Sequence, residues 1–223
     1  MDWWVLDSLR PEDRRTLLST LRLRTYGRRE VVFHEGDPAD ALHLIVSGHV
    51  AAHVSSPSGE PVTVAVLGQG ECFGELALAG QGRQRAATMT ALDRCETLSL
   101  TRSQFDRLRS QSPDLDRLLV LLLAERVERL DQYLLEALYT PADKRVARRL
   151  VELCDAYRGD SSPVVIPLTQ DALASLAGTT RPTTNQALQN MARLGIVEVK
   201  RGQLIVLDEV ALLGLSQPPP SYG

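Results

Sequence analysis

Short apolar runs separated by glycine-containing turns dominate the chain between residues 31 and 100. The runs cover residues 31–33, 42–46, 62–66 and 96–100, and turn residues stand at 35–38, 47–48, 56–59 and 68–70. Strands of this length with closely spaced turns predict an antiparallel β-barrel or roll. The segment before them, up to about Tyr26, is predicted as a short helix that begins near Pro11.

A long helix is predicted after the strands, because no Gly or Pro intervenes between Pro113 and about Leu138. Apolar residues recur in it with gaps of 3, 4, 3, 4 and 3, at Val120, Leu123, Val127, Leu130, Leu134 and Ala137. This spacing is typical of the a/d seam of a two-helix dimer. The alternative is one broad buried face within a monomer. A second stripe, Leu115, Leu118, Leu119 and Leu122, is free to pack on the roll.

The last third of the chain has the pattern of a winged helix-turn-helix. Thr140-Pro141 ends the long helix, and further helices are predicted at 142–157, 169–177 and 181–193. A hairpin of residues 196–199 and 204–207 follows, with basic residues at its tip. Thr169 and Thr180 are suited to cap the two short helices, and a Gly-containing turn joins them.

The second short helix is predicted to face DNA, because no acidic residue occurs between Pro182 and Arg193 and acid would repel phosphate. Leu188, Met191 and Leu194 are predicted to hold this helix to the core. Its outward positions are Arg181, Thr183, Thr184, Asn185, Gln186 and Gln189. The alternative is a small helical domain that binds protein.

Composition narrows the class of protein. The 223 residues carry a net charge of −3, which excludes a uniformly basic coat for nucleic acid. No apolar run approaches the roughly 20 residues of a membrane helix, and the N-terminus lacks the pattern of a secretory signal. Three scattered cysteines suggest no disulfide framework, and we expect a cytoplasmic protein without a membrane partner.

An anion site is conceivable at Gly74-Glu75-Leu76 with Arg85 ten residues further on. Such a turn offers backbone N–H groups, and an arginine supplies a planar fork of donors that matches phosphate. A surface loop with an Arg–Glu pair is the alternative on these residues alone.

No combination of nucleophile and base is visible, so no enzyme is expected. His43, His49 and His53 would suit a cupin-like metal enzyme, but we expect them to be structural and expect no metal site.

Several motifs together resemble the cyclic-AMP receptor protein/fumarate-nitrate regulator (CRP/FNR) family of bacterial transcription factors. They are residues 33–37, 47–50, 73–76, 85–88 and 173–181, and the match covers residues 10–207. The resemblance implies an α+β fold with an N-terminal antiparallel β-roll of the cyclic-nucleotide-binding jelly-roll type, a long dimerisation helix and a C-terminal winged helix-turn-helix. The corresponding segments are 1–112, 113–139 and 140–215, followed by a disordered tail at 216–223.

The resemblance also implies an effector site in the roll. Gly74 and Glu75, followed by Leu76, match the pair that meets ribose and phosphate in members that bind cyclic AMP, and Arg85 matches the phosphate-binding arginine. A hydroxyl residue usually follows that arginine, but Ala86 offers only its backbone N–H. Leu130 and Asp131 stand where a Thr-Ser pair normally meets adenine.

No cofactor is certain from these matches, and cyclic AMP or another cyclic nucleotide is the candidate ligand. Three interpretations stay open: weakened or altered nucleotide binding, another effector, and a constitutive regulator. The iron–sulfur sensors of the family carry an N-terminal cysteine cluster, which is absent here because no cysteine precedes Cys72.

On the DNA side, the resemblance implies a homodimer that binds a two-fold operator and has RNA polymerase as a further partner. Arg181 matches the arginine that reads guanine, whereas Pro182 and Gln186 replace a Glu and an Arg of the usual motif. Thr183 and Asn185 share the groove-facing surface with Gln186. The residues expected to hold phosphates are Thr169, Gln170, Thr179, Thr180, Lys200 and Arg201.

Overall fold

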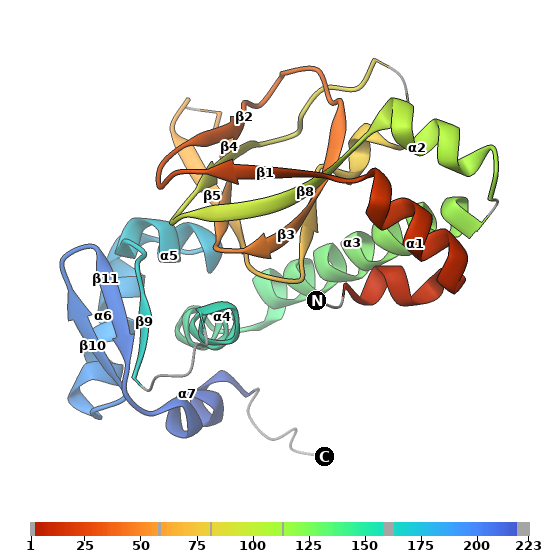
Figure 1. Ribbon diagram of the computed structural model, residues 1–223. Coiled ribbons are helices and arrows are strands. Elements are labelled where there is room, and N and C mark those ends of the chain that lie inside the picture. Colours follow the sequence, from red (N-terminus) through yellow and green to blue (C-terminus); the bar gives the residue numbers. More distant parts are fainter. Residues whose placement is uncertain (1–2, 58, 81, 113, 158–162, 218–223) are drawn as a thin grey trace. The chain divides into compact units, whose positions relative to one another are not determined.

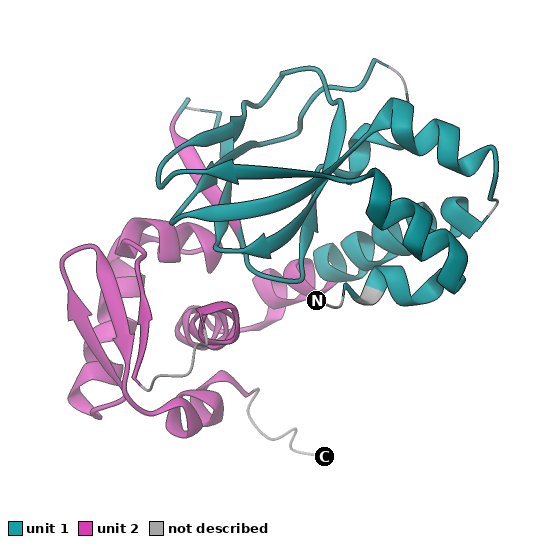
Figure 2. Cartoon of the chain, in the orientation of Figure 1, with its two compact units in different colours: residues 1–59, 66–131 teal, residues 60–65, 132–223 magenta. Residues whose placement is uncertain are grey.

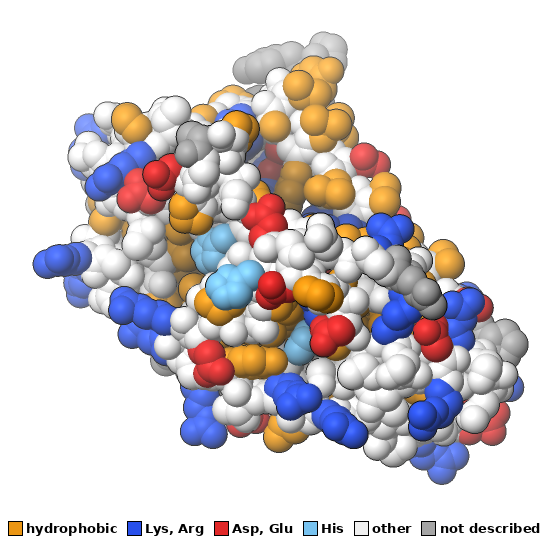
Figure 3. Space-filling view, turned by 90° about the horizontal axis from the view of Figure 1, so that it is seen from above, with side chains coloured by type: hydrophobic (Ala, Val, Ile, Leu, Met, Phe, Trp, Pro, Cys, Tyr) orange, Lys and Arg blue, Asp and Glu red, His pale blue; other side chains and the backbone are white. Residues whose placement is uncertain are grey.

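The computed structural model describes residues 3–57, 59–80, 82–112, 114–157 and 163–217. The chain forms two compact units, one of residues 1–59 and 66–131 and one of residues 60–65 and 132–223 (Figure 2). No helix among the described residues is long and apolar enough to span a membrane. On the face in Figure 3, acidic and basic side chains are interspersed rather than gathered into one positive surface.

The first unit contains the predicted roll except for most of its strand β5, whose residues up to 65 belong to the second unit (Figure 1). Its helical elements are η1 (Trp4–Ser8), α1 (Pro11–Thr20), η2 (Glu75–Ala77), α2 (Arg102–Arg109) and the first part of α3 (Asp114–Tyr139). The strands of the roll are β1 (Arg22–Tyr26), β2 (Val31–Phe33), β3 (Ala41–Ser47), β4 (Val50–Ser55), β5 (Pro61–Leu67), β6 (Cys72–Phe73), β7 (Thr88–Ala91) and β8 (Cys95–Thr101).

These strands form two four-stranded sheets, in the orders β1-β8-β3-β6 and β2-β7-β4-β5. The pairings with recorded register are antiparallel, as predicted. The prediction of helix up to Tyr26 was wrong for residues 22–26. Those residues form β1, which pairs with β8 from Arg22 opposite Ser99 to Tyr26 opposite Cys95. Four of the five β1 side chains are exposed, so no alternation of buried and exposed positions marked the strand.

One apolar core joins the roll to the helices of the first unit. Leu42, Leu44 and Leu100 from the strands pack with Phe105 of α2, which is fully buried. Thr101 caps α2: its side chain accepts from the Gln104 N–H, and the Gln104 side chain accepts from the Thr101 N–H. The stripe predicted to pack on the roll is confirmed, because Leu115, Leu118 and Leu122 are buried in this core, with Leu119 packed against it.

The other stripe of α3 faces away from this core. Val120, Val127, Leu130 and Leu134 are between 52% and 63% exposed. Ala137 is also exposed, and Leu123 is half-buried. An exposed apolar stripe along a helix of 26 residues contradicts the alternative of one broad buried face within a monomer.

The second unit contains a winged helix-turn-helix. Its elements are α4 (Ala142–Tyr157), β9 (Val164–Ile166), α5 (Gln170–Leu176), α6 (Arg181–Arg193), β10 (Val197–Lys200), β11 (Gln203–Val206) and α7 (Glu209–Ser216). The strands form an antiparallel sheet in the order β10-β11-β9. The predicted helices and hairpin are confirmed to within a residue or two, whereas β9 and α7 were missed.

The sequence predicted the burial of two residues of the α6 region wrongly. Leu194 is 68% exposed because it lies beyond the helix, at its C-cap. Thr184 was placed outward but is fully buried, on the same side as Leu188 and Met191. The spacing of four between Thr184 and Leu188 places both on one face of the helix.

The predicted disordered tail begins too early. Ser216 ends α7 and is buried, and its carbonyl accepts a hydrogen bond from Arg148 Nε at 2.8 Å. The carbonyl of Gln217 accepts from Lys144 Nζ at 2.8 Å. The rest of the predicted tail, 218–223, lies outside the described residues.

A buried ion-pair network joins the end of α3 to α4 within the second unit. Arg149 is only 4% exposed, and it pairs with Glu136 of α3 and with Glu152 of its own helix. Arg148 binds the same Glu136 at 2.9 Å, and the Arg149 guanidinium lies 4.3 Å from the centre of the Tyr133 ring. The carboxylate of Glu136 therefore compensates two guanidinium groups, one of them buried.

Replacing Glu136 is expected to destabilise the second unit. Glu136→Gln leaves the buried Arg149 without its inner carboxylate, and we expect a loss of about 2 kcal/mol in the free energy of unfolding. Denaturant unfolding followed by circular dichroism measures the change. The matched control is Glu152→Gln, which removes the half-exposed partner of the same arginine and is expected to cost less than about 1 kcal/mol. Equal losses in the two variants would contradict the assignment of Glu136 as the main counter-charge.

Candidate functional site

A left-handed glycine shapes the predicted anion site of the roll. Gly74 has φ +82° and directly precedes η2, which starts at Glu75. A Cβ atom at this position would stand 2.6 Å from Arg85 Nη1 and 2.8 Å from the carbonyl oxygen of Ala41. Both the backbone conformation and the close approach therefore require glycine.

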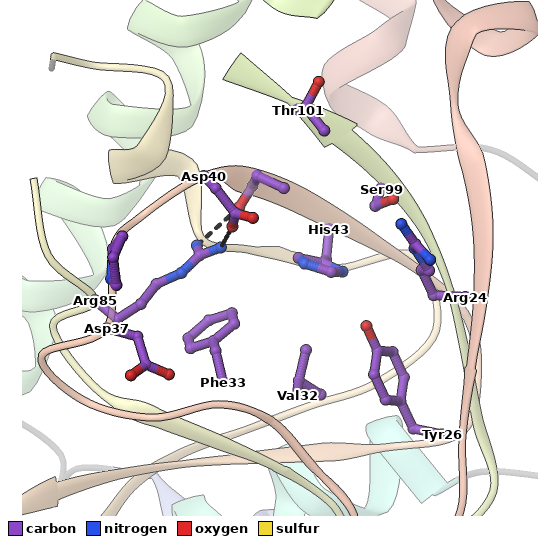
Figure 4. A pocket seen from close by; sticks show the side chains of 12 residues that line it. Arg24, Tyr26, Val32, Phe33, Asp37, Asp40, His43, Arg85, Ser99 and Thr101 are labelled. Carbon is purple, nitrogen blue, oxygen red and sulfur yellow. Dashed lines mark hydrogen bonds and ion pairs between the residues drawn. The ribbon is translucent and has the colours of Figure 1, made fainter. Parts of the chain in front are cut away.

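The Arg85 side chain lies against this turn, inside the roll (Figure 4). Its Nη1 donates to the carbonyl of Ala41 at 2.8 Å, and its Nη2 donates to Asp40 Oδ1 at 2.7 Å. Its Cζ lies 3.8 Å from the centre of the Phe33 ring, close enough for a cation–π contact. Its Nε is buried and has no hydrogen-bond partner among the described residues.

The environment of Arg85 is electrostatically balanced. Burial lowers the pKa of its guanidinium, and the negative charge of Asp40 counteracts this most strongly, with Asp37 and Glu75 adding to it. Arg85 therefore remains a cation within a low-dielectric pocket, where its attraction for an anion exceeds that of a surface arginine.

A cavity of about 440 Å³ opens beside Arg85. It is lined by Arg24, Tyr26, Val32, Phe33, Asp37, Pro38, Asp40, Ala41, His43, Arg85, Ser99 and Thr101 (Figure 4). Of the predicted ligand residues, this cavity includes Arg85 alone. Sequence reasoning missed the others, although Phe33 and Asp37 lie in a motif that supported the resemblance.

His43 forms part of the buried wall of this cavity. Its ring stacks on Phe73 with the centroids 4.9 Å apart, and its Nδ1 lies 3.1 Å from Thr97 Oγ1. Burial lowers the pKa of His43 to about 4, with a smaller contribution from the charge of Arg85. His43 is therefore a neutral packing residue at physiological pH.

The other histidines considered for a metal site are elsewhere. His49 Nδ1 lies 2.5 Å from Asp93 Oδ2, and His53 is half-buried on β4. Across the described part of the chain, no three His, Cys, Asp or Glu residues are grouped so that they could hold a metal ion.

The remaining predicted ligand residues are only partly brought together. Glu75 and Leu76 are half-buried in η2 beside Gly74, and Ala86 is exposed next to Arg85. Leu130 and Asp131 are exposed on α3. Among the described residues, no hydrogen bond or ion pair joins Leu130 or Asp131 to the residues of the Gly74 turn or to Arg85.

The α3 helix approaches the turn through other residues. Arg129 Nη1 lies 3.3 Å from Glu71 Oε1, which precedes β6. Cys72, the first residue of β6, is so enclosed that burial raises the pKa of its thiol to about 12, with the negative charges of Glu75 and Glu125 adding to the effect. The helix therefore packs close to the Gly74 turn at Glu125 and Arg129, and Leu130 and Asp131 directly follow Arg129.

The predicted DNA surface is built on two capped helices. The Thr169 side chain accepts from the Ala172 N–H at the start of α5, and the Thr180 side chain accepts from the Thr183 N–H at the start of α6. Pro182 lies in the first turn of α6, where a missing N–H costs little. Arg181, the first residue of α6, is exposed at this capped end.

An acidic residue that sequence reasoning missed lies beside Arg181. Asp171 Oδ1, in the first turn of α5, is 3.4 Å from Arg181 Nε, and both side chains are exposed. Asp171 lies on the neighbouring helix α5, outside the acid-free stretch 182–193, and the fold brings it close to the start of α6. The turn through Gly178, with φ +57°, brings the start of α6 close to α5.

The other predicted DNA residues lie on the accessible side of the two helices or at the hairpin tip. Thr180 Oγ1 and Thr183 Oγ1 are 2.9 Å apart, and Gln186 Nε2 donates to Asn190 Oδ1 at 3.1 Å. Lys200 pairs with Glu198 at 3.3 Å. Thr169 and Arg201 are exposed, and Gln170, Thr179 and Asn185 are half-buried.

Two family models match separate parts of the chain. Residues 23–112 match the family model of the cyclic nucleotide-binding domain, and residues 144–215 match that of the Crp-like helix-turn-helix domain. The chain is 34% identical over 209 residues to the cyclic AMP receptor protein of Thermus thermophilus, covering 94% of each chain. It is 27% identical over 211 residues to the CRP-like cAMP-activated global transcriptional regulator of Mycobacterium tuberculosis, covering 93% of this chain and 94% of the relative.

Solved structures show the same similarity. The Thermus thermophilus catabolite activator protein is 31% identical with a TM-score of 0.54, and the match covers 95% of this chain and 97% of that one. A second transcriptional regulator of the CRP/FNR family from Thermus thermophilus, TTHA1359, is 26% identical with a TM-score of 0.69, over 87% of this chain and 98% of that one.

The Mycobacterium tuberculosis relative is described as a global transcriptional regulator. With a cyclic nucleotide-binding domain before a DNA-binding Crp-like helix-turn-helix domain, and with relatives that match along nearly its whole length, the chain belongs to the CRP/FNR family of transcriptional regulators.

Proposed function

We propose that the chain is a homodimeric, sequence-specific transcriptional regulator whose DNA binding is gated by a small anionic effector in the roll. The observation that carries this proposal is the buried guanidinium of Arg85 held against the Gly74 turn. A buried cation beside a turn of this kind suits a phosphate. Relatives along nearly the full length of the chain are described as cyclic AMP receptors or as cAMP-activated.

A cyclic nucleotide is the proposed effector. Arg85 would bind its phosphate, together with the backbone of Gly74, Leu76 and Ala86, and Glu75 would accept from a ribose hydroxyl. Leu130 and Asp131 would meet the base from α3. An acceptor at Asp131 in place of a hydroxyl is expected to alter base preference rather than abolish binding.

An effector-independent regulator is the second candidate, and two observations favour it. The Arg85 fork is already engaged by Asp40 and Ala41. Leu130, in place of a hydroxyl residue, extends the apolar stripe of α3. If the α3 seam favours the DNA-binding conformation of the dimer without ligand, an effector has no conformational equilibrium to shift.

The exposed stripe of α3 is the proposed dimer seam. Its members would pack against the same stripe of a second chain, as a/d residues do in a two-helix coiled coil. The dimer would place two α6 helices about 34 Å apart, one turn of DNA, on a two-fold operator. In this proposal the segments 1–112, 113–139 and 140–215 act as effector roll, dimer helix and DNA-binding domain, and RNA polymerase is a further partner.

On DNA, the start of α6 would read bases and its surroundings would hold the backbone. Arg181 would donate to a guanine, with Thr183, Asn185 and Gln186 along the groove. Phosphate contacts would come from Thr169, Gln170, Thr179, Thr180, Lys200 and Arg201.

Calorimetry with nucleotide-stripped protein tests the effector site. We expect cyclic AMP or cyclic GMP to bind, and Arg85→Ala to weaken binding at least about 30-fold, because a charge-assisted contact in a buried site is lost. Arg83→Ala, at an exposed neighbour, is the control and should bind as the parent does. Absence of heat for both nucleotides would instead support the effector-independent candidate.

Sedimentation analysis tests the dimer. The double substitution Val127→Arg/Leu134→Arg places two charges on the apolar seam and is expected to yield monomers at micromolar concentration. Glu128→Arg adds the same side chain at an exposed polar position of α3 and should remain dimeric. A parent chain that sediments as a monomer would refute the seam.

Binding to sites selected from a random DNA library tests base reading. Arg181→Ala is expected to cost about 1–3 kcal/mol on the selected site and to relax the preference at one base pair of each half-site. Arg201→Ala, at the hairpin tip, should weaken selected and random DNA alike. An equal loss on both DNAs for Arg181→Ala would argue against base reading.

A further inference from the structure

The ion pair at Arg85 is strongly asymmetric. The Arg85 side chain is 3% exposed, whereas that of its partner Asp40 is 78% exposed, with 2.7 Å between Nη2 and Oδ1. Asp40 directly precedes β3, so its backbone is fixed by the sheet. Its carboxylate lies beside the Arg85 guanidinium (Figure 4), and most of its side-chain surface is accessible to water. One partner is therefore locked inside the roll, and the other can leave the pair by rotation of its side chain alone.

Asp40 is the principal counter-charge of the buried guanidinium. The carbonyl of Ala41 and the ring of Phe33 supply only partial negative charge. Asp37 also acts on Arg85, but one of its oxygens already accepts from the His34 N–H at 2.7 Å. Removing Asp40 would thus leave a cation in a desolvated site with one of its donors, Nε, already unsatisfied.

An anionic ligand that reaches Arg85 would encounter this arrangement before binding. Nη1 and Nη2 of the guanidinium already donate hydrogen bonds. The acceptor of the Nη2 bond is the negatively charged carboxylate of Asp40. A phosphate and the Asp40 carboxylate repel each other. A phosphate therefore binds the Arg85 guanidinium more weakly while Asp40 remains paired with it.

We propose that Asp40 is an internal counter-anion of the Arg85 site, which the phosphate of the effector displaces. The carboxylate stabilises the buried cation in the empty roll and lowers the affinity of the site for external anions. The inference rests on the proposed effector site for its ligand, but the role of Asp40 toward Arg85 can be measured with inorganic phosphate alone.

The first arm of the test is thermal unfolding of the full-length Asp40→Asn variant. Tryptophan fluorescence, which comes from Trp3 and Trp4 at the start of the same unit, follows the roll. In chloride buffer the variant is expected to unfold at a lower temperature than the parent, and inorganic phosphate at constant ionic strength should restore most of the difference. Asp106→Asn is the matched control, because it removes a carboxylate 3.4 Å from Arg102 on the surface of the same unit. The parent and this control should respond little to phosphate.

The second arm is calorimetry with cyclic AMP and cyclic GMP. Asp40→Asn is expected to bind the preferred nucleotide roughly two- to fivefold more tightly than the parent, the size expected when one competing ion pair with an exposed partner is removed. Asp106→Asn should match the parent.

The outcomes separate this inference from the proposed function. If the parent binds nucleotide through Arg85 and Asp40→Asn changes neither affinity nor the phosphate response, the role of Asp40 is overturned and the effector site stands. If the parent binds no nucleotide, the effector site fails, and the phosphate arm still decides on Asp40. A phosphate response of Asp40→Asn that disappears in Asp40→Asn/Arg85→Gln supports the inference, and an equal response in both variants overturns it.

Discussion

The requirement to hold one cation inside an apolar roll sets the geometry around Arg85. A guanidinium loses most of its hydration on burial, so carbonyl, carboxylate and aromatic groups must replace water. Ala41, Asp40 and Phe33 do so from the β2–β3 region, and the close approach of Nη1 explains why a residue without a side chain stands at position 74. Arg85 thereby holds the start of β3, at Asp40 and Ala41, against the turn at Gly74, although these segments are far apart in sequence.

Arginines play a comparable structural part in the second unit. Arg145 of α4 donates to the carbonyl of Thr140, where the long helix has ended, and to those of Ala177 and Gly178 in the turn before α6. These acceptors have no partner within their own helices, because they lie at or beyond helix ends. Together with the Glu136 network, Arg145 links the end of α3 to the turn before α6.

Most of the fold was predictable because its signals are local. Glycine-punctuated strands, the unbroken apolar period of α3 and the threonine caps of α5 and α6 each depend on neighbouring residues. The errors come from long-range packing: β1 is defined by its partner β8, and α7 follows a strand with no periodicity to separate them. At the site, Gly74 and Arg85 were recognisable as a pair, whereas Asp40 was not, since nothing in its own neighbourhood indicates a partner 45 positions away.

The exposed pair of Asp171 and Arg181 has a consequence for how such a surface would sample a genome. A carboxylate at a DNA-facing position opposes the polyanion at every sequence, while a guanidinium that reads a base gains only where that base occurs. If Arg181 reads a base as proposed, the pair would lower the time spent at incorrect sites by more than the time spent at correct ones. Discrimination would then come from faster release from background DNA rather than from tighter capture of the target site.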